Sequence, residues 1–423
     1  MKQFWATLVA IVCFSTINTV LAQVTIDIDG GQERGVAIAI VPFSEQGTIP
    51  QKFHEIVIND LGASGKFDPI DPSRFLSQPS RDAEVQYKDW RLIGAEILVI
   101  GEAVVQTGDR YNVVYTIYDV AKQKQIGTAR YSASSSQLRD LAHLISDEIY
   151  ANVTGKQGVF RTKIAFVKKT SGGASLEVAD WDGYGAYSVV KSSQPILSPA
   201  WSSDGQNIAF VTYAGGSSVI KAVNLSSGNV TNVATSSRGF NSAPAWSPDG
   251  SSIAYTSSRS GNPEIYVRSV NGGSARKLTS HWGIDTEPSW SPNGSSIIFT
   301  SNRSGKPNLY EVNVAGGSPR RITFEGKENT EGSYSFDGKQ LVYVAEGGIV
   351  SIMNRSNGRI KSLSSRKLDE SPSFAPNGDM VLYATKLGYN GKLVVSSADG
   401  RASQTLNFLS GDVREPTWAP YNR

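Results

Sequence analysis

Three histidines are the side chains of this sequence best suited to move a proton near neutral pH, because imidazole titrates there. They are His54, His143 and His281, and none of them falls into a metal-ligand or catalytic-triad pattern. His54 and His143 lie in segments with helical periodicity, where we expect ordinary surface or packing residues. His281 precedes a loop and is a candidate partner contact. The sequence also lacks a Gly-x-Ser-x-Gly nucleophile motif, so we predict no catalytic residue.

Two further patterns resemble ion-binding loops. The run Asp180-Trp-Asp182-Gly183 carries two carboxylates, which calcium favours, but it falls where a hairpin turn is expected. The pairs Gly215-Gly216 and Gly316-Gly317 resemble phosphate loops, yet no helical pattern follows them to supply the amide groups of a helix N-terminus. We therefore predict turns at all three places, with no metal and no cofactor.

One repeated sequence motif predicts most of the strands and turns of this chain. Its copies span Pro199 to Gly205, Pro244 to Gly250, Pro288 to Gly294 and Pro372 to Gly378, with weaker copies at Gly332 to Gly338 and Pro416 to Pro420. Each copy holds an aromatic residue at its third position, and these are Trp201, Trp246, Trp290, Tyr334, Phe374 and Trp418, at steps of 45, 44, 44, 40 and 44 residues. Such a period predicts four-stranded propeller blades.

Each copy of the motif is typical of a strand entering a hairpin, and a short apolar second strand follows. These second strands include Ile208 to Phe210 and Ile253 to Tyr255, with one copy upstream at Ile164 to Phe166. The upstream copy has no aromatic first strand before it, whereas Trp418 has no second strand after it. We therefore expect Trp418 to complete the blade of Ile164, giving a closed ring of six blades with the aromatic residues buried between them.

The residues before the repeats follow a different pattern, in which strands alternate with helical segments. Apolar runs predict strands over Val36 to Phe43, Ile97 to Val104, Tyr111 to Val120 and Gln125 to Tyr131. Helical periodicity predicts a helix opened by Pro50 and ended by Gly62 and Gly65, a short helix over Tyr87 to Ile93, and a helix from Leu138 to about Gly155. We expect an α/β domain with a mixed sheet and two main helices.

The first residues have the layout of a cleaved secretory signal, with Lys2, an apolar run from Phe4 to Phe14, and Ala22. The run is shorter than the ~20 apolar residues of a membrane span, so we expect a protein that does not itself span a membrane. The single cysteine, Cys13, lies inside this segment, and no basic block suggests nucleic acid. The predicted organisation is a signal peptide over 1–22, an α/β domain over 23–158 and a propeller over 159–423, closed by the carboxyl-terminal strand.

The residues just before each innermost strand should surround one opening of the propeller axis, and here they are notably acidic. They include Asp285, Glu287, Glu331, Glu370 and Glu415, with Arg414 beside the last. Such a rim would favour a partner that presents lysine or arginine. Ordinary solvated loop charges are an equally good interpretation of these residues alone.

The repeats, the preceding α/β domain, the signal and the total length together resemble the TolB family over essentially the whole mature chain. Several peptidase propellers share the repeat alone. The resemblance implies a monomeric, non-enzymatic, periplasmic adaptor of the Tol-Pal system, which maintains outer-membrane integrity and supports constriction of the outer membrane in cell division. It also implies that the propeller binds the lipoprotein Pal and that the amino-terminal segment binds TolA. Other outer-membrane-associated proteins are further candidate partners.

Residues for both partners follow from the resemblance. The Pal contacts carry over to the loops before the second and third innermost strands, which here supply Phe240, Asn241, Ala243, Thr286 and Glu287; Phe240 departs from the usual polar residue. The TolA contacts carry over to Gln23, Val24, Thr25, Ile26, Asp27, Ile28 and Asp29. The residues alone make this last segment an edge strand with one apolar face, and edge strands also recruit partners by strand addition.

Two other function classes remain open. A hydrolase whose propeller filters substrate would require a catalytic domain, and we expect no room for one in the five residues after Trp418. A propeller enzyme or lectin would hold calcium or sugar in the axial channel. The sequence favours the adaptor.

Overall fold

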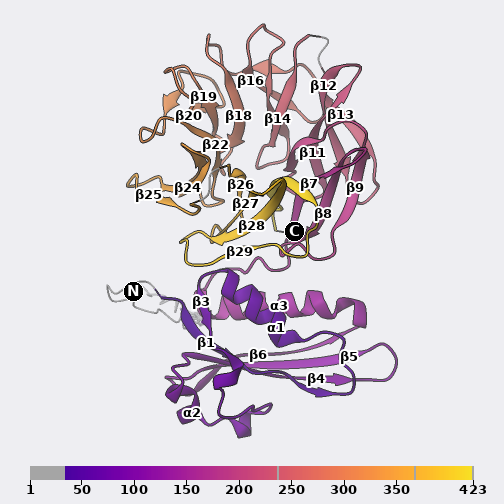
Figure 1. The fold of residues 1–423 in the computed structure, drawn as a ribbon, viewed down its shortest axis with the longest axis vertical. Coiled ribbons are helices and arrows are strands. Elements are labelled where there is room, and N and C mark those ends of the chain that lie inside the picture. Colours follow the sequence, from indigo (N-terminus) through magenta and orange to yellow (C-terminus); the bar gives the residue numbers. More distant parts are fainter. Residues whose placement is uncertain (1–33, 236–237, 366–367, 422–423) are drawn as a thin grey trace, which may run out of the picture.

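The computed structural model describes residues 34–235, 238–365 and 368–421 and shows two domains that lie one above the other in Figure 1. The α/β domain is at the bottom of the view and the propeller at the top. The predicted signal peptide and the segment Gln23 to Asp29 lie outside the described residues. None of the helices in the described ranges has the length and apolar character needed to cross a bilayer.

The α/β domain is built on a mixed sheet with the strand order β3-β1-β4-β5-β6. Strand β1 pairs in parallel with β3 and β4, and β4, β5 and β6 are antiparallel. A short strand β2 pairs in parallel with the far end of β4. The strands are β1 (Val36–Ile40), β2 (Ser44–Gln46), β3 (Phe67–Pro69), β4 (Ile97–Val105), β5 (Tyr111–Asp119) and β6 (Lys124–Ala133). The predicted mixed sheet is confirmed, although β2 and β3 were not expected.

Helices cover both faces of this sheet. Helices α1 (Phe53–Ala63) and α3 (Leu138–Thr154) pack on the face toward the propeller (Figure 1), and α2 (Tyr87–Leu92) packs on the other. Single 3-10 turns occupy Pro72–Arg74, Asp82–Glu84 and Ser135–Gln137. The predicted start of α1 at Pro50 is wrong by three residues, because Lys52 is the N-cap, and Gly62 lies inside the helix. Helix α3 ends as predicted at Gly155, whose φ of +72° suits glycine.

The propeller consists of six four-stranded antiparallel sheets, as the repeat period predicted. The innermost strands of blades 1 to 6 are β10 (Leu197–Trp201), β14 (Asn241–Trp246), β18 (Asp285–Trp290), β22 (Asn329–Tyr334), β26 (Glu370–Phe374) and β30 (Asp412–Trp418). The second strands are β11 (Asn207–Ala214), β15 (Ser252–Ser257), β19 (Ser296–Ser301), β23 (Gln340–Ala345), β27 (Met380–Leu387) and β7 (Lys163–Thr170).

The two outer strands of each blade follow in the same order. The third strands are β12 (Ser217–Asn224), β16 (Glu264–Ser269), β20 (Asn308–Asn313), β24 (Ile349–Asn354), β28 (Asn390–Ser397) and β8 (Gly173–Asp180). The outermost strands are β13 (Val230–Ala234), β17 (Arg276–Lys277), β21 (Arg320–Arg321), β25 (Ile360–Ser362), β29 (Ser403–Thr405) and β9 (Tyr187–Ser192). These outermost strands are short, which limits the exposed sheet edge.

The ring closes as predicted, because β30 from the carboxyl-terminal part of the chain pairs with β7. Trp418 lies opposite Ile164 in this antiparallel pair. Blade 6 therefore combines one strand from the end of the repeat array with three from its beginning. This arrangement joins blade 5 to blade 1 through a complete sheet.

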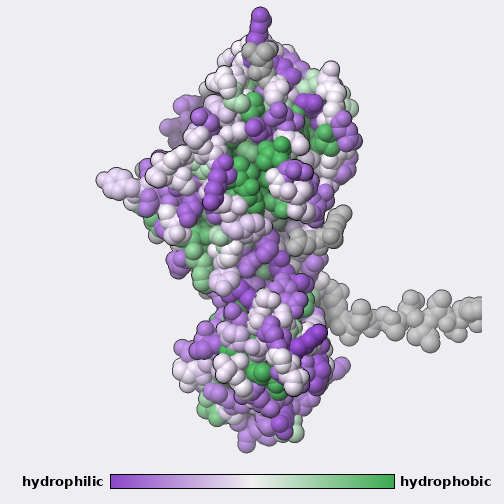
Figure 2. Space-filling view, turned by 90° about the vertical axis from the view of Figure 1, so that its right-hand side faces the viewer, coloured by the Kyte–Doolittle hydropathy of each residue, from purple (hydrophilic) through white to green (hydrophobic). Residues whose placement is uncertain are grey.

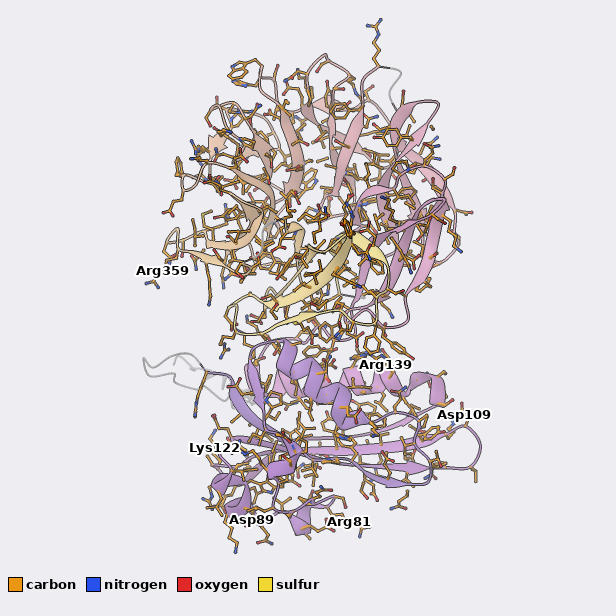
Figure 3. All side chains as sticks on the ribbon, in the orientation of Figure 1. Arg81, Asp89, Asp109, Lys122, Arg139 and Arg359 are labelled. Atoms are coloured by element: carbon orange, nitrogen blue, oxygen red, sulfur yellow. The ribbon has the colours of Figure 1, made fainter. Side chains whose placement is uncertain are left out.

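The two domains share a continuous apolar core. Residues of α1 and α3 belong to the same buried cluster as residues of blades 5 and 6. Phe160 stands edge-on to Trp181, and Trp181 stacks on Trp418 with a centroid distance of 6.4 Å. Ion pairs also join the two domains, among them Arg139 with Asp182 and Lys156 with Asp379, and Arg139 lies between the domains in Figure 3. On the face of the molecule shown in Figure 2, the waist between the domains is mostly hydrophilic, and apolar residues gather on the propeller above it.

Candidate partner-binding site at the propeller mouth

The innermost strands enclose an axial cavity of about 780 Å³. The repeated aromatic residues contribute to its wall, and three of them, Trp201, Trp246 and Trp290, are only half-buried. Full burial between blades, which the sequence predicted for all six, holds for Tyr334, Phe374 and Trp418 alone. We call the end of the cavity at which the innermost strands begin the mouth.

Every innermost strand has the same irregularity next to the mouth. One residue adopts a left-handed conformation with φ between +47° and +56°, and the pairing with the second strand shifts register at that point. The six residues are Ser198, Ala243, Glu287, Glu331, Ser371 and Glu415. Such a conformation is unfavourable for residues other than glycine. Its sixfold recurrence shows that the inner edge of the ring imposes it.

Three of these six positions carry glutamates that connect neighbouring blades. Glu287 accepts a hydrogen bond from the backbone N–H of Glu331 at 3.0 Å, and Glu331 accepts one from Ser371 at 2.5 Å. Glu415 accepts one from Ser198 at 2.5 Å, across the seam between blades 6 and 1. Each carboxylate thus binds the left-handed residue of the next blade. These contacts compensate part of the backbone strain and hold the mouth in shape.

Three carboxyl groups at the mouth, those of Glu331, Glu370 and Glu415, have pKa values above the ordinary value, chiefly because they are buried. Desolvation, followed by the nearby charge of Glu287, raises the pKa of Glu331 to about 7. Desolvation also raises the pKa of Glu415 to about 6, with a smaller contribution from Glu370. Burial likewise raises the pKa of Glu370, against the opposing effect of Arg414. The mouth is therefore less negative near neutral pH than its sequence suggests.

Two residues predicted to contact a partner instead hold the structure together. Asp285 is fully buried and pairs with Arg303 at 2.7 Å. Asn241 is also fully buried, and its backbone N–H donates to the hydroxyl of Ser218 at 2.9 Å. Each is the first residue of an innermost strand. Its side chain lies on the buried face of that strand, because successive side chains alternate between the two faces. Neither side chain is available to a partner in this conformation.

The remaining predicted residues lie at or near the surface of the mouth. Ala243, Glu287, Glu331, Glu370 and Glu415 line the cavity. Thr286 is half-buried, and Arg414 pairs with Asp412 at 2.9 Å. Phe240 is exposed in the loop before β14. The structure therefore brings most of the predicted set together around one opening.

Sequence reasoning missed a group of exposed apolar side chains in the loops that enter the innermost strands. Besides Phe240, the group contains Trp282 and Phe324, each 73% exposed, together with Ile284 and Leu368. These residues occur in four successive loops, before β14, β18, β22 and β26. The signal that could have identified them is a large apolar residue in a polar loop, repeated from blade to blade. Exposed apolar groups of this kind mark interaction sites.

His281, a predicted partner contact, supports one of these loops. Its Nδ1 accepts a hydrogen bond from the backbone N–H of Gly283 at 3.0 Å, and its ring contacts Trp282. Its own backbone N–H donates to Glu264 at 2.8 Å. The imidazole thus fixes the loop that presents Trp282.

Comparisons with known proteins agree over both domains. Residues 24–126 match the TolB amino-terminal domain family, and residues 150–422 match the TolB beta propeller domain family. The chain is similar to the Tol-Pal system protein TolB of Methylobacillus flagellatus, with 51% identity over 403 residues, 94% of this chain and 93% of that protein. The corresponding protein of Nitrosococcus oceani is 48% identical over 411 residues, 95% of this chain and 94% of that one.

A solved structure is similar as well. The crystal structure of TolB from Acinetobacter baumannii has a TM-score of 0.84 and 38% sequence identity, and the match covers 92% of this chain and 98% of that chain. The names of the two sequence relatives describe a component of a Tol-Pal system. None of the three names describes an enzymatic activity.

Proposed function

Because the chain belongs to the TolB family, we propose that it is a periplasmic adaptor of a Tol-Pal system that binds proteins and catalyses no reaction. Its propeller binds the lipoprotein Pal, and its segment Gln23 to Asp29 binds TolA. Through these two contacts the protein maintains outer-membrane integrity and supports constriction of the membrane in cell division. The relatives' names support membership of the system; the two partners and the cellular role are the proposed part.

The observation that carries the propeller assignment is the mouth itself. Exposed apolar side chains in the loops, Trp282 and Phe324 foremost, surround an opening lined with carboxyl groups. Large apolar anchors within a polar rim are typical of protein-binding surfaces. The carboxyl groups Glu287, Glu331, Glu370 and Glu415 favour a partner that inserts lysine or arginine.

The first prediction concerns Phe324, for which blade 4 offers a matched control. Phe336 lies in the hairpin between β22 and β23, at the opposite end of the innermost strand, and is 48% exposed. If Pal binds at the mouth, Phe324→Ala should weaken its binding about tenfold or more, as expected for an interface anchor, whereas Phe336→Ala should leave the affinity unchanged. Titration calorimetry with the soluble domain of Pal measures both.

Equal effects of the two substitutions, or no binding of Pal by the unmodified protein, would contradict the assignment. Retention of polysaccharide alone from envelope extract would favour a lectin.

For TolA, amide hydrogen exchange over Gln23 to Gly35 should slow when TolA is added. Unchanged exchange there would remove the support for strand addition.

A further inference from the structure

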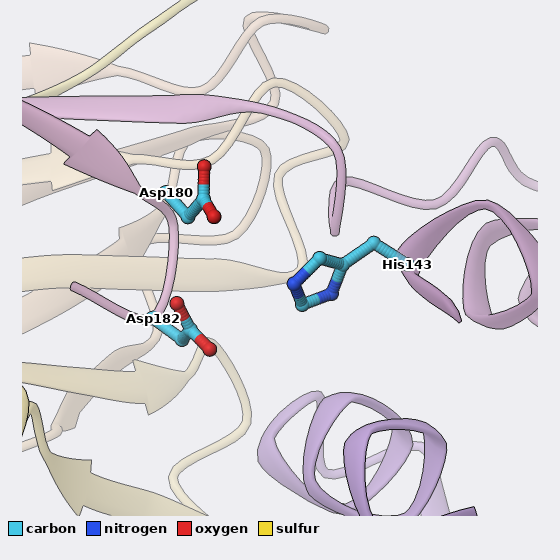
Figure 4. A group of neighbouring side chains, drawn as sticks. All are labelled: His143, Asp180 and Asp182. Carbon is cyan, nitrogen blue, oxygen red and sulfur yellow. The ribbon is translucent and has the colours of Figure 1, made fainter. Parts of the chain in front are cut away.

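A second cluster of charged side chains lies at the interface between the domains, far in sequence from the mouth residues. It brings together His143 of α3, Asp60 of α1, Asp180 at the end of β8 and Asp182 in the turn that follows. Figure 4 shows the imidazole facing the two aspartates of the propeller. His143 is 2% exposed, Asp60 is 0% exposed and Asp182 is 5% exposed. The expectation that His143 is an ordinary packing residue is therefore incomplete.

The contacts of His143 leave one side of its ring unused. Nδ1 lies 2.8 Å from Oδ2 of Asp60. Nε2 has no hydrogen-bond partner among the described residues, and neither has the other carboxylate oxygen of Asp60. The ring and the carboxylates of Asp180 and Asp182 present atoms within 4.8 Å of one another. A buried nitrogen that faces two carboxylates in this way is positioned to carry a proton.

The ion pairs of the cluster do not neutralise it when the imidazole of His143 is uncharged. Arg139 pairs with Asp182 and lies 3.6 Å from Asp180, and Lys163 also pairs with Asp180. With Asp60 included, three carboxylates face two cations, so a neutral imidazole leaves one net negative charge in a buried site. Such an excess is costly. Protonation of His143 removes it.

A metal ion is a poorer source of that charge. The three donors His143, Asp180 and Asp182 could surround an ion, but the guanidinium of Arg139 already binds Asp182 and is itself only 15% exposed. A divalent ion would take that carboxylate away and leave a cation beside a buried guanidinium. The proton requires no such displacement.

We propose that His143 is a proton-binding latch, whose imidazolium, held between Asp60 and the Asp180–Asp182 pair, ties helices α1 and α3 to blade 6. Loss of the proton leaves the carboxylates of both domains facing each other with unbalanced charge, which weakens the docking of the two domains. The latch makes the strength of this interface dependent on pH.

The direction of the pH effect follows from the surroundings of the ring. Burial opposes protonation of His143, but the carboxylates of Asp60 and Asp182 outweigh it and raise its pKa above the ordinary value. A histidine with a raised pKa stabilises the folded state fully below its unfolded pKa of about 6.5. That contribution disappears as the pH rises through the pKa of the folded protein. Docking should therefore be tighter in mild acid than in mild alkali.

Two other carboxyl groups near the ring also have raised pKa values: Asp182, chiefly because of its burial, and Asp147. Asp147 lies one turn further along α3 and accepts the backbone N–H of Phe160 at 2.8 Å; burial raises its pKa to about 7. Its protonation also favours the folded state at lower pH. Asp140, also on α3, pairs with Arg161 at the surface. An experiment must therefore separate His143 from Asp147.

The first test is direct titration of the imidazoles of the full chain by NMR after selective labelling at Cε1. The protein has only three histidines, so the substitutions His143→Gln and His54→Gln assign their signals. The midpoint of His143 should lie above 6.5, and that of His54 below it, because desolvation lowers the pKa of His54. A midpoint of His143 below 6.5, or an absence of titration, overturns the proposal.

The second test measures docking through hydrogen-exchange protection factors in α1, α3 and the turn after β8, between pH 5.5 and 8. Each unit by which the pKa is raised corresponds to about a tenfold change in an equilibrium constant, so protection should fall several-fold as the pH rises. Asp147→Asn should keep this fall, and His143→Gln should abolish it. If the protection factors of His143→Gln fall with pH as much as those of the unmodified protein, the latch is overturned. It is also overturned if one equivalent of zinc chloride shifts the NMR signal of His143 and increases the protection factors, because the site would then bind a metal ion.

Discussion

The side chains of the glutamates at the mouth accept hydrogen bonds from backbone N–H groups. The donors are the left-handed residues of the neighbouring blades. Glu287, Glu331 and Glu415 each bind the next blade, while Ser198, Ala243 and Ser371 occupy the same position without a carboxylate. The sequence placed these acids at the axial opening, just before the innermost strands; they line the cavity but lie inside those strands. It did not predict their partners, because a contact between blades joins residues about one repeat apart and leaves no local pattern.

A pH-dependent stability of the ring follows from Glu331. Its pKa of about 7 is above the ordinary value, so the folded protein binds this proton more tightly than the unfolded chain, and the resulting stability is lost as the pH rises through about 7. Glu331→Gln keeps an acceptor for Ser371 without the charge. Thermal unfolding from pH 5 to pH 8 should therefore show a loss smaller by roughly 1–2 kcal/mol in the variant. The exposed Glu325→Gln should follow the unmodified protein, and an identical profile for Glu331→Gln would contradict this account.

At the scale of elements, sequence spacing predicted the strands of the propeller more completely than those of the α/β domain. Six aromatic residues at nearly constant steps predicted six blades, and the unpaired Ile164 and Trp418 predicted the closing pair. Strands β2 and β3 were missed because each has three residues without apolar alternation, and β3 ends in a proline. Their pairing depends on β4 and β1, which lie elsewhere in the chain.

The closing strand should matter more for stability than its counterparts. Trp418 is buried, stacks on Trp181 and donates a hydrogen bond from Nε1 to Thr162 at 2.8 Å, whereas the equivalent Trp201 is half-buried at the cavity wall. Trp418→Ala should lower the free energy of unfolding by about 3–5 kcal/mol, and Trp201→Ala by clearly less. Urea denaturation followed by circular dichroism compares them. Equal losses of unfolding free energy would show that the closing strand contributes no more to stability than its counterpart in blade 1.

At the scale of the whole molecule, the domain interface combines a shared apolar core with complementary charge. Lys66, Arg139 and Lys156 of the α/β domain meet acids of blades 5 and 6, namely Asp180, Asp182, Asp379 and Asp399. No feature of the sequence predicted this contact. Tyr150 and Asp379, for example, are separated by 229 positions, and neither stands in a recognisable motif.

Asp379 offers a test of this interface. It accepts hydrogen bonds from Tyr150 at 2.7 Å and Lys156 at 2.9 Å. The equivalent position in blade 4 is Lys339, which is exposed and pairs with Asp337 of its own blade. Asp379→Ala leaves a buried tyrosine hydroxyl unpaired and should cost about 1–3 kcal/mol. Lys339→Ala should cost little. Calorimetry of the full chain measures both, and a loss for Asp379→Ala no greater than for Lys339→Ala would contradict the assigned role.

The pairing of β30 with β7 has a consequence for biogenesis. A ribosome delivers β7 hundreds of residues before β30, so the inner edge of blade 6 stays unpaired throughout translation. Unpaired edges of this kind invite aggregation. A nascent or arrested chain that ends before Asp412 would leave that edge exposed to chaperones and proteases. The pairing of β30 with β7 therefore distinguishes chains that contain the closing strand from chains that lack it.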